Sequence, residues 1–164
     1  MRVHDCLDTP DGTFVVIEED GVVVAAGWTD DAHELALRSR LNGGPGMRGP
    51  VQAADAVTAF YEGDHRAVAK VPVAAMGTSF RKSVWNALRG IGAGQVRTYG
   101  ELAAELGSPG ASRAVGAACG ANPIALFIPC HRVTGASGAL TGFAWGVDVK
   151  RSLLEREAGA TLLA

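Results

Sequence analysis

The chain has 164 residues, of which 48% are hydrophobic and 20% are charged, and its formal net charge is −2 at pH 7. That length and composition predict one domain or two small ones with an adequate core. The sequence shows neither an apolar run long enough to span a membrane nor a charged-then-apolar leader, so we expect neither a membrane protein nor a secreted one.

Three cysteines, Cys6, Cys119 and Cys130, form an odd set without a CxxC pair. This usage favours reduced thiols in the cytoplasm and argues against structural zinc. Charge is divided unevenly, because residues 1–79 carry six Lys/Arg and twelve Asp/Glu, whereas residues 80–164 carry nine and five. A basic half in an acidic chain weakly indicates a polyanionic partner. The boundary is expected near Met76, which gives domains at 1–76 and 77–164.

The first domain begins with a predicted hairpin. Residues 13–17 and 22–26 are rich in β-branched residues and lie on either side of Asp20-Gly21, which is a strong signal for a tight turn. Residues 67–73 alternate enough to predict another strand. This half contains no group of titratable side chains in a recognisable arrangement, so it is interpreted as a scaffold.

Two helices are predicted between these strands. Asp30 or Asp31 is placed to cap the first, which carries Leu35, Leu37 and Leu41 and is expected to end at the flexible loop of residues 42–46. The second is expected at 51–61, where apolar residues recur at helical spacing.

The second domain opens with three predicted helices. Thr78 or Ser79 caps the first, which has an apolar stripe at helical spacing. Thr98 and Glu101 fit a capping box at the start of the second. Ser108-Pro109 predicts the start of the third, as N-cap and first-turn proline. The last two helices, joined by a tight turn, predict a helix-turn-helix.

The third of these helices consists mostly of small residues, among them Ser112, Ala114, Gly116, Ala117 and Ala118. Small side chains allow a backbone to come close to another group, although glycine costs about 1 kcal/mol of helix propensity relative to alanine. The only long cationic side chain is Arg113, near the N-terminal end, where recognition helices usually meet base edges. A helix packed tightly on its neighbour with one solvated arginine gives the same pattern, so both interpretations stay open.

Residues 124–128 form a short apolar run between two prolines, which predicts a buried strand. Pro129 should stop sheet pairing and present Cys130 at an edge. Cationic or proton-accepting neighbours such as Arg132 and His131 lower a thiol pKa from its ordinary value of ~8.5 and so favour the reactive thiolate. A free cysteine is most often a small buried hydrophobe, and spacing alone does not decide between the two interpretations.

The last predicted helix, capped by Asp148, places Val149, Leu153 and Glu157 on one stripe that faces the core. Because an unpaired buried charge is costly, we expect Glu157 to be paired, with His131 as the partner. A carboxylate that orients an imidazole, which in turn accepts a thiol proton, is the arrangement of an activated nucleophile.

The segment Ile128-Pro129-Cys130-His131-Arg132-Val133, preceded by Asn122-Pro123, resembles the active-site signature of the O6-alkylguanine-DNA alkyltransferases, also called methylated-DNA–protein-cysteine methyltransferases. The likeness begins at Gly77-Thr78-Ser79-Phe80 and continues to Glu157, about half of the chain. It implies an α/β protein, with a small N-terminal α+β domain of the ribonuclease H-like kind and a mostly helical C-terminal domain with a winged-type helix-turn-helix.

The resemblance also implies DNA repair by direct reversal, in which duplex DNA is bound and an alkylated guanine is turned out of the stack. Cys130 would accept the alkyl group irreversibly, once per molecule, while His131 takes the thiol proton through a water and Glu157 orients the histidine. Tyr99 would donate to N3 of the purine. Asn122 would hold the turn before the active-site segment.

Arg113 would fill the space left by the flipped base. Further DNA contacts are expected from Ser79, Ser112, Ala114, Gly116 and Arg132, and the pocket is expected to include Cys119, Val133, Phe143, Ala144 and Trp145. The implied partner is double-stranded DNA containing alkylated guanine, with O4-alkylthymine as a weaker substrate. A monomer without cofactor or metal is expected.

Two other classes of protein stay open. A non-catalytic helix-turn-helix protein would bind alkylated DNA without removing the alkyl group, but relatives of that kind lack the cysteine that this chain has at Cys130. A cysteine hydrolase would need His131 beside the thiol, and neighbouring side chains of an extended segment point to opposite faces.

Overall fold

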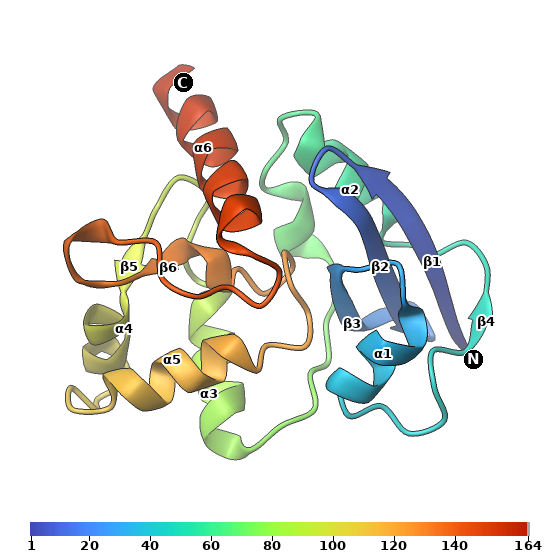
Figure 1. The fold of residues 1–164 in the computed structure, drawn as a ribbon, viewed down its shortest axis with the longest axis horizontal. Coiled ribbons are helices and arrows are strands. Elements are labelled where there is room, and N and C mark those ends of the chain that lie inside the picture. Colours follow the sequence, from blue (N-terminus) through green and yellow to red (C-terminus); the bar gives the residue numbers. More distant parts are fainter. Residues whose placement is uncertain (164) are drawn as a thin grey trace. The chain divides into compact units, whose positions relative to one another are not determined.

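The computed structural model describes residues 1–163, with side chains for residues 1–159, and has a mixed α/β fold made of two compact units (Figure 1). The first unit comprises Met1–Met76 together with Pro123–Phe127, and the second comprises the rest of the described chain. The segment 123–127 falls in the predicted C-terminal domain by sequence order, but it belongs to the first unit.

Four strands form the sheet of the first unit in the order β3-β2-β1-β4, where β1 is Arg2–Thr9, β2 is Gly12–Glu19, β3 is Val22–Trp28 and β4 is Met47–Arg48. The predicted hairpin is the antiparallel β2–β3 pair. Asp20 and Gly21 have φ values of 50° and 83°, and two successive positive φ values are what a type I′ turn requires. β1 was not predicted and pairs with β2 along its whole length.

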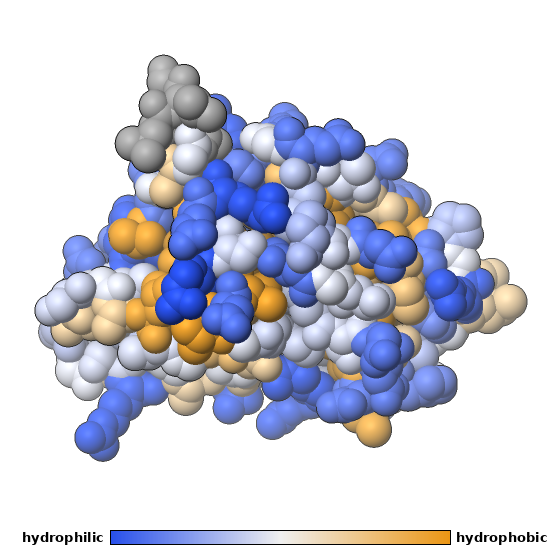
Figure 2. All heavy atoms as spheres, turned by 45° about the horizontal axis from the view of Figure 1, so that its top comes forward, coloured by the Kyte–Doolittle hydropathy of each residue, from blue (hydrophilic) through white to orange (hydrophobic). Residues whose placement is uncertain are grey.

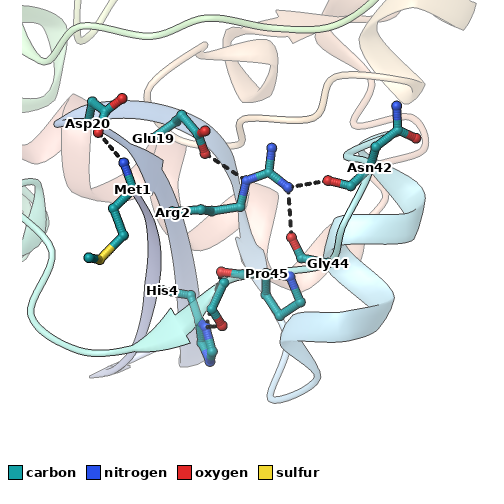
Figure 3. Close-up of polar contacts among 9 residues, drawn as sticks. Met1, Arg2, His4, Glu19, Asp20, Asn42, Gly44 and Pro45 are labelled. Atoms are coloured by element: carbon teal, nitrogen blue, oxygen red, sulfur yellow. Dashed lines mark hydrogen bonds and ion pairs between the residues drawn. The ribbon is translucent and has the colours of Figure 1, made fainter.

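Side chains of β1 hold the loop at residues 42–46 (Figure 3). Arg2 donates to the carbonyl oxygens of Asn42 and Gly44, and Nδ1 of His4 donates to the carbonyl of Gly46 at 3.2 Å. Gly46 has a φ of 76°, and a Cβ there would lie 2.2 Å from the carbonyl oxygen of Arg2. The close approach of this loop to β1 therefore requires glycine.

Two helices of the first unit differ in detail from the prediction. Asp31 caps α1 (Ala32–Arg38) by accepting from the amide of Glu34 at 3.0 Å. The helix ends at Arg38, earlier than the predicted end at residue 42, and Leu35 is buried whereas Leu37 is 79% exposed. Residues two apart on a helix do not share a face.

Helix α2 (Ala54–Tyr61) begins three residues later than predicted. The carboxylate of Glu18 is 2% exposed and accepts from the backbone amides of Gln52, at 2.9 Å, and Ala53, at 2.7 Å. A side chain from the sheet thus satisfies amides at the start of the helix, which would otherwise lack partners.

Residues 67–73 do not form the predicted strand. Ala67–Lys70 is a short 3-10 helix, η1, and Val73 makes only an isolated bridge to Val23. The apolar residues Val68 and Val71 lie three apart, which is one turn of a 3-10 helix. Val71 and Val73 lie two apart, which gives this short stretch the appearance of strand alternation.

The second unit is mostly helical. Its elements in chain order are α3 (Ser79–Leu88), β5 (Arg97–Thr98), α4 (Tyr99–Glu105), α5 (Ser112–Gly120), η2 (Cys130–Arg132), β6 (Val133–Thr134), η3 (Ala136–Gly138) and α6 (Val147–Leu163). Thr78 caps α3, and the predicted capping box of Thr98 and Glu101 is present at the start of α4. A Cβ on Gly77 would lie 2.6 Å from the ring of Trp85, so the entry to α3 requires glycine.

Helix α5 begins at Ser112, and the predicted start at Ser108-Pro109 was wrong. The amide of Ala111 donates to the carbonyl of Ser108 at 2.9 Å, which closes a four-residue turn with Pro109-Gly110 at its centre. Proline followed by glycine is a favoured pair for the central positions of such a turn.

The apolar run at 124–128 is buried but is not a strand. Only Ile124 bridges to the sheet, at Ala26, and the chain then passes through turns in which Leu126 has a φ of 73°. A short apolar run indicates burial without fixing the backbone conformation. Helix α6 begins at Val147, so Asp148 lies in its first turn and not at the predicted cap.

Hydrophilic residues cover most of the face seen in Figure 2, and the hydrophobic residues on it gather in small patches. Among residues 1–163, no helix combines the length and the apolar character needed to cross a bilayer.

Candidate active site

A short parallel pairing brings two distant segments of the second unit together. In the β5–β6 pair, Arg97 lies opposite Val133 and Thr98 opposite Thr134. Helix α4 starts directly after β5, and β6 directly follows η2. The pairing therefore places the first residue of α4, Tyr99, next to the segment that carries the candidate nucleophile.

Cys130 lies in η2 and is 7% exposed. Its Sγ accepts a hydrogen bond from Nδ2 of Asn122 at 3.2 Å, and the same amide donates to the carbonyl of Ile128 at 2.8 Å. Asn122 thus bonds both to the backbone ahead of Cys130 and to the sulfur itself, and the contact with the sulfur was not predicted. A donor at the sulfur favours the charged thiolate over the neutral thiol.

The expected pairing of His131 and Glu157 is present. Nε2 of His131 lies 3.0 Å from Oε2 of Glu157, and the two side chains are 0% and 1% exposed. An ionised carboxylate only accepts hydrogen bonds, so Nε2 carries the proton and Nδ1 is the proton-accepting nitrogen. Nδ1 is buried and has no hydrogen-bond partner among the described residues.

Arg132 does not face outward, as its predicted contact with DNA requires. It is 4% exposed, and it donates to Glu157 through Nη2 at 2.6 Å and Nε at 3.0 Å, and to the carbonyl of Ile91 through Nη1 at 2.6 Å. Charge-assisted bonds of this kind offset the cost of burying a guanidinium. Arg132 instead fixes the carboxylate that contacts His131, so the prediction that Arg132 contacts DNA was wrong.

Burial and neighbouring charges set the protonation of this cluster. Burial lowers the pKa of His131 and outweighs the opposing effect of Glu157, which leaves the imidazole neutral at pH 7. Burial alone would raise the pKa of Glu157, but His131 and Arg132 together lower it to about 2. Because a guanidinium stays charged, Arg132 keeps the carboxylate ionised even beside a neutral imidazole.

A second thiol and a buried lysine lie near Cys130. Burial, with a smaller contribution from Cys130, raises the pKa of Cys119 to about 12, so this thiol stays protonated. Lys150 is 1% exposed, and burial lowers its pKa while the two cysteines raise it. Lys150 was not predicted, yet it lies three and seven residues before Leu153 and Glu157, a spacing that indicates one helix face.

The remaining predicted site residues are distributed around this cluster. Arg113 and Ala114 are exposed on α5, Ser112 and Gly116 are half-buried there, and Ser79 is exposed at the start of α3. Of the predicted pocket residues, Val133 is buried, Cys119, Phe143 and Trp145 are half-buried, and Ala144 is exposed. Within the described part of the chain, no three His, Cys, Asp or Glu side chains are grouped so that they could hold a metal ion.

Most of the second unit lies within a stretch of sequence that matches a known protein family. Residues 79–159 match the model of the DNA-binding domain of 6-O-methylguanine DNA methyltransferase. A methylated-DNA–protein-cysteine methyltransferase of Mycobacterium tuberculosis is 40% identical over 157 residues, which make up 96% of this chain and 93% of that protein. The chain belongs to this methyltransferase family. Its members are DNA-repair proteins that reverse damage directly, and the resemblance seen in the sequence is confirmed.

Other relatives match a shorter part of the chain. The methylated-DNA–protein-cysteine methyltransferase of Methanosarcina acetivorans is 51% identical over 106 residues, which are 65% of this chain and 67% of that protein. The match thus spans about two thirds of that relative. A crystal structure of the M. tuberculosis methyltransferase in complex with DNA superposes with a TM-score of 0.82 at 35% identity, covering 96% of this chain and 94% of that one. The mixed α/β fold is therefore that of the family.

Proposed function

We propose that Cys130 removes the alkyl group from O6-alkylguanine in duplex DNA and keeps it, so that each molecule acts once. O4-alkylthymine is proposed as a weaker substrate. The observation that carries this proposal is the buried cluster in which Asn122 contacts the Cys130 sulfur and Glu157 fixes the tautomer of His131. No cofactor is needed, because the thiol is consumed as a reactant.

The chemistry begins with the thiol proton. Nδ1 of His131 takes it through a water, and the imidazolium that forms is stabilised by the carboxylate of Glu157, which stays ionised. The Cys130 thiolate then attacks the alkyl carbon, a carbon–sulfur bond forms, and the bond between that carbon and O6 breaks with its electron pair passing to the purine. A thioether has no easy route back to the thiol, which makes the step irreversible.

Tyr99 completes the reaction by donating to N3 of the purine as negative charge develops there. Burial raises the pKa of Tyr99, so the phenol keeps its proton at neutral pH. The β5–β6 pairing, which ties the start of α4 to the Cys130 segment, supports this role.

DNA is proposed to bind across α4 and α5, which would act as a winged-type helix-turn-helix within a domain at 77–164. Arg113 is exposed near the start of α5, where it would enter the duplex and take the place of the flipped base. Residues 1–76 would form a scaffold domain of the ribonuclease H-like kind. We propose that the protein works as a monomer in the cytoplasm, where its three free cysteines would stay reduced.

A duplex that carries labelled O6-methylguanine tests the proposal. We expect one label per molecule on Cys130, no transfer by Cys130→Ser, and unchanged transfer by Cys6→Ser, whose thiol lies in β1. Label on another residue, or no label at all, would reject the assignment of Cys130. Tight binding to the lesion with the methyl group left in place would favour the non-catalytic alternative.

A further inference from the structure

Tyr99 has a hydrogen-bond partner on the loop that precedes α6. Oγ1 of Thr141 donates to the phenol oxygen of Tyr99 at 3.2 Å. Thr141 is exposed and lies between η3 and α6, far from Tyr99 in the sequence. The contact therefore depends on where the loop is held.

Lys150 holds the loop in this place. Its Nζ donates to the backbone carbonyl of Thr141 at 3.2 Å and lies 5.9 Å from the centroid of the Tyr99 ring. The Lys150 ammonium group is thus hydrogen-bonded to the backbone of Thr141 and lies within cation–π range of the Tyr99 ring. On α5, a Cβ at Gly116 would lie 3.9 Å from the same ring, so the ring also packs against that helix.

The direction of the Thr141 hydrogen bond determines what the phenol can do. A phenol has one proton to donate and also accepts hydrogen bonds. When Thr141 donates to the phenol oxygen, the proton of Tyr99 is left for another acceptor. The bond also restricts rotation of the phenol proton, because one lone pair of the oxygen is already engaged.

We propose that Thr141 is a positioning residue for alkyl transfer, whose hydroxyl aligns Tyr99 so that the phenol proton points to N3 of the flipped purine. This inference rests on the function proposed above and adds a residue to it. Thr141 touches no reacting atom and acts only through Tyr99. Burial raises the pKa of Tyr99 and the Thr141 hydrogen bond lowers it, which is the effect expected of a donor to the phenol oxygen.

A single-turnover experiment at saturating DNA tests the inference. Thr141→Val keeps the shape of the side chain and removes the donor, and it should slow transfer from O6-methylguanine about 3- to 10-fold, the value of one neutral hydrogen bond. Thr141→Ser restores the hydroxyl and should recover the rate to within about twofold. Affinity for the same duplex, measured in a Cys130→Ser background, should not change.

A lesion without the N3 acceptor separates positioning from a general structural role. On O6-methyl-3-deazaguanine the wild-type protein should be slower, and Thr141→Val should cause no further loss. Thr141→Val should likewise have no effect in a Tyr99→Phe background, because the two substitutions remove one shared interaction. Equal slowing on both lesions, or weaker DNA binding with an unchanged rate, would overturn the inference. Failure of the wild-type protein to transfer any label would instead reject the proposed function.

Discussion

Among the residues whose side chains are described, each of the two units buries one carboxylate deeply, and the two carboxylates have different partners. In the first unit, Glu18 accepts from two backbone amides at the start of α2. In the second, Glu157 accepts from the side chains of His131 and Arg132. Backbone amides cannot titrate, so Glu18 only fixes the fold, whereas Glu157 acts on an imidazole whose other nitrogen can accept a proton. For these two carboxylates, the groups to which each is bonded therefore indicate its function better than its depth of burial does.

The largest expected effect comes from Glu157→Gln. The amide cannot stabilise an imidazolium, so transfer to Cys130 should slow about 100-fold, as measured by single-turnover labelling. The same change leaves the buried guanidinium of Arg132 without its counter-charge, which should cost about 3–5 kcal/mol of unfolding free energy. A rate within threefold of wild type, at matched folded concentration, would contradict the role given to Glu157.

The pH dependence of the transfer rate sharpens the comparison between the two units, because the group that titrates, His131, lies in the second unit. In the proposed mechanism, transfer needs a neutral His131, whose pKa is lowered from 6.5 by burial, so the rate should fall about tenfold per pH unit only well below pH 6.5. Rates measured between pH 4.5 and 8 would show this acid limb. An acid limb centred above pH 6.5 would mean that the imidazole is charged in the resting protein.

The pH dependence of the unfolding free energy should be set by His131 and Glu157 as well. The pKa of His131 is lower in the folded state than its ordinary value of 6.5, so its contribution is present above pH 6.5 and lost as the pH falls. Glu157, with a pKa lowered from 4.5 to about 2, contributes above pH 4.5, and that contribution is lost between pH 4.5 and pH 2. Urea unfolding across this range should show both losses, and Glu157→Gln should abolish the lower one.

Glu18→Gln should lower stability, as Glu157→Gln does, but should leave the transfer rate unchanged. A glutamine side chain offers one acceptor oxygen, so one of the two amides, of Gln52 or Ala53, would lose its partner at a cost of about 1–3 kcal/mol. The transfer rate per folded molecule should stay within twofold of wild type. If Glu18→Gln slowed transfer per folded molecule as strongly as Glu157→Gln does, the distinction between the two carboxylates would fail.

The smallest effects concern two matched helix caps. Asp31→Ala at α1 and Thr98→Ala at α4 each remove a side chain that accepts from a backbone amide, and each should cost about 1 kcal/mol of unfolding free energy. Only Thr98 precedes a residue of the proposed site, Tyr99. We therefore expect Thr98→Ala alone to slow transfer, by about twofold, when both variants are assayed at equal folded concentration.

Local and periodic signals predicted much of this molecule. The Asp20-Gly21 turn and the Thr98–Glu101 capping box each depend on a few adjacent residues, and both are present. Glu157 was identified because it recurs on the buried stripe of one helix. In each case the physical cause lies within a single element, so one stretch of sequence contains it.

The pairing of His131 with the distant Glu157 was predicted, but other features that depend on distant partners were missed. β1 is half-buried at almost every position, so it shows none of the alternation that a strand with one solvent face displays. Arg132 was assigned to DNA because its partner, Glu157, lies on another helix and its burial cannot be inferred from the neighbouring residues. The small shift from Ser108 to Ser112 at the start of α5 arose because the Pro-Gly turn was interpreted as a helix start.

The position of Glu157 on α6 has a consequence for the time at which the protein becomes competent. During translation Cys130 and His131 leave the ribosome before Glu157, and domains fold as units while synthesis proceeds. Until α6 has emerged and packed, the imidazole has no carboxylate to orient it. On the proposed function, the Cys130 sulfur of a nascent chain would therefore become a competent methyl acceptor only after the second unit has been completed.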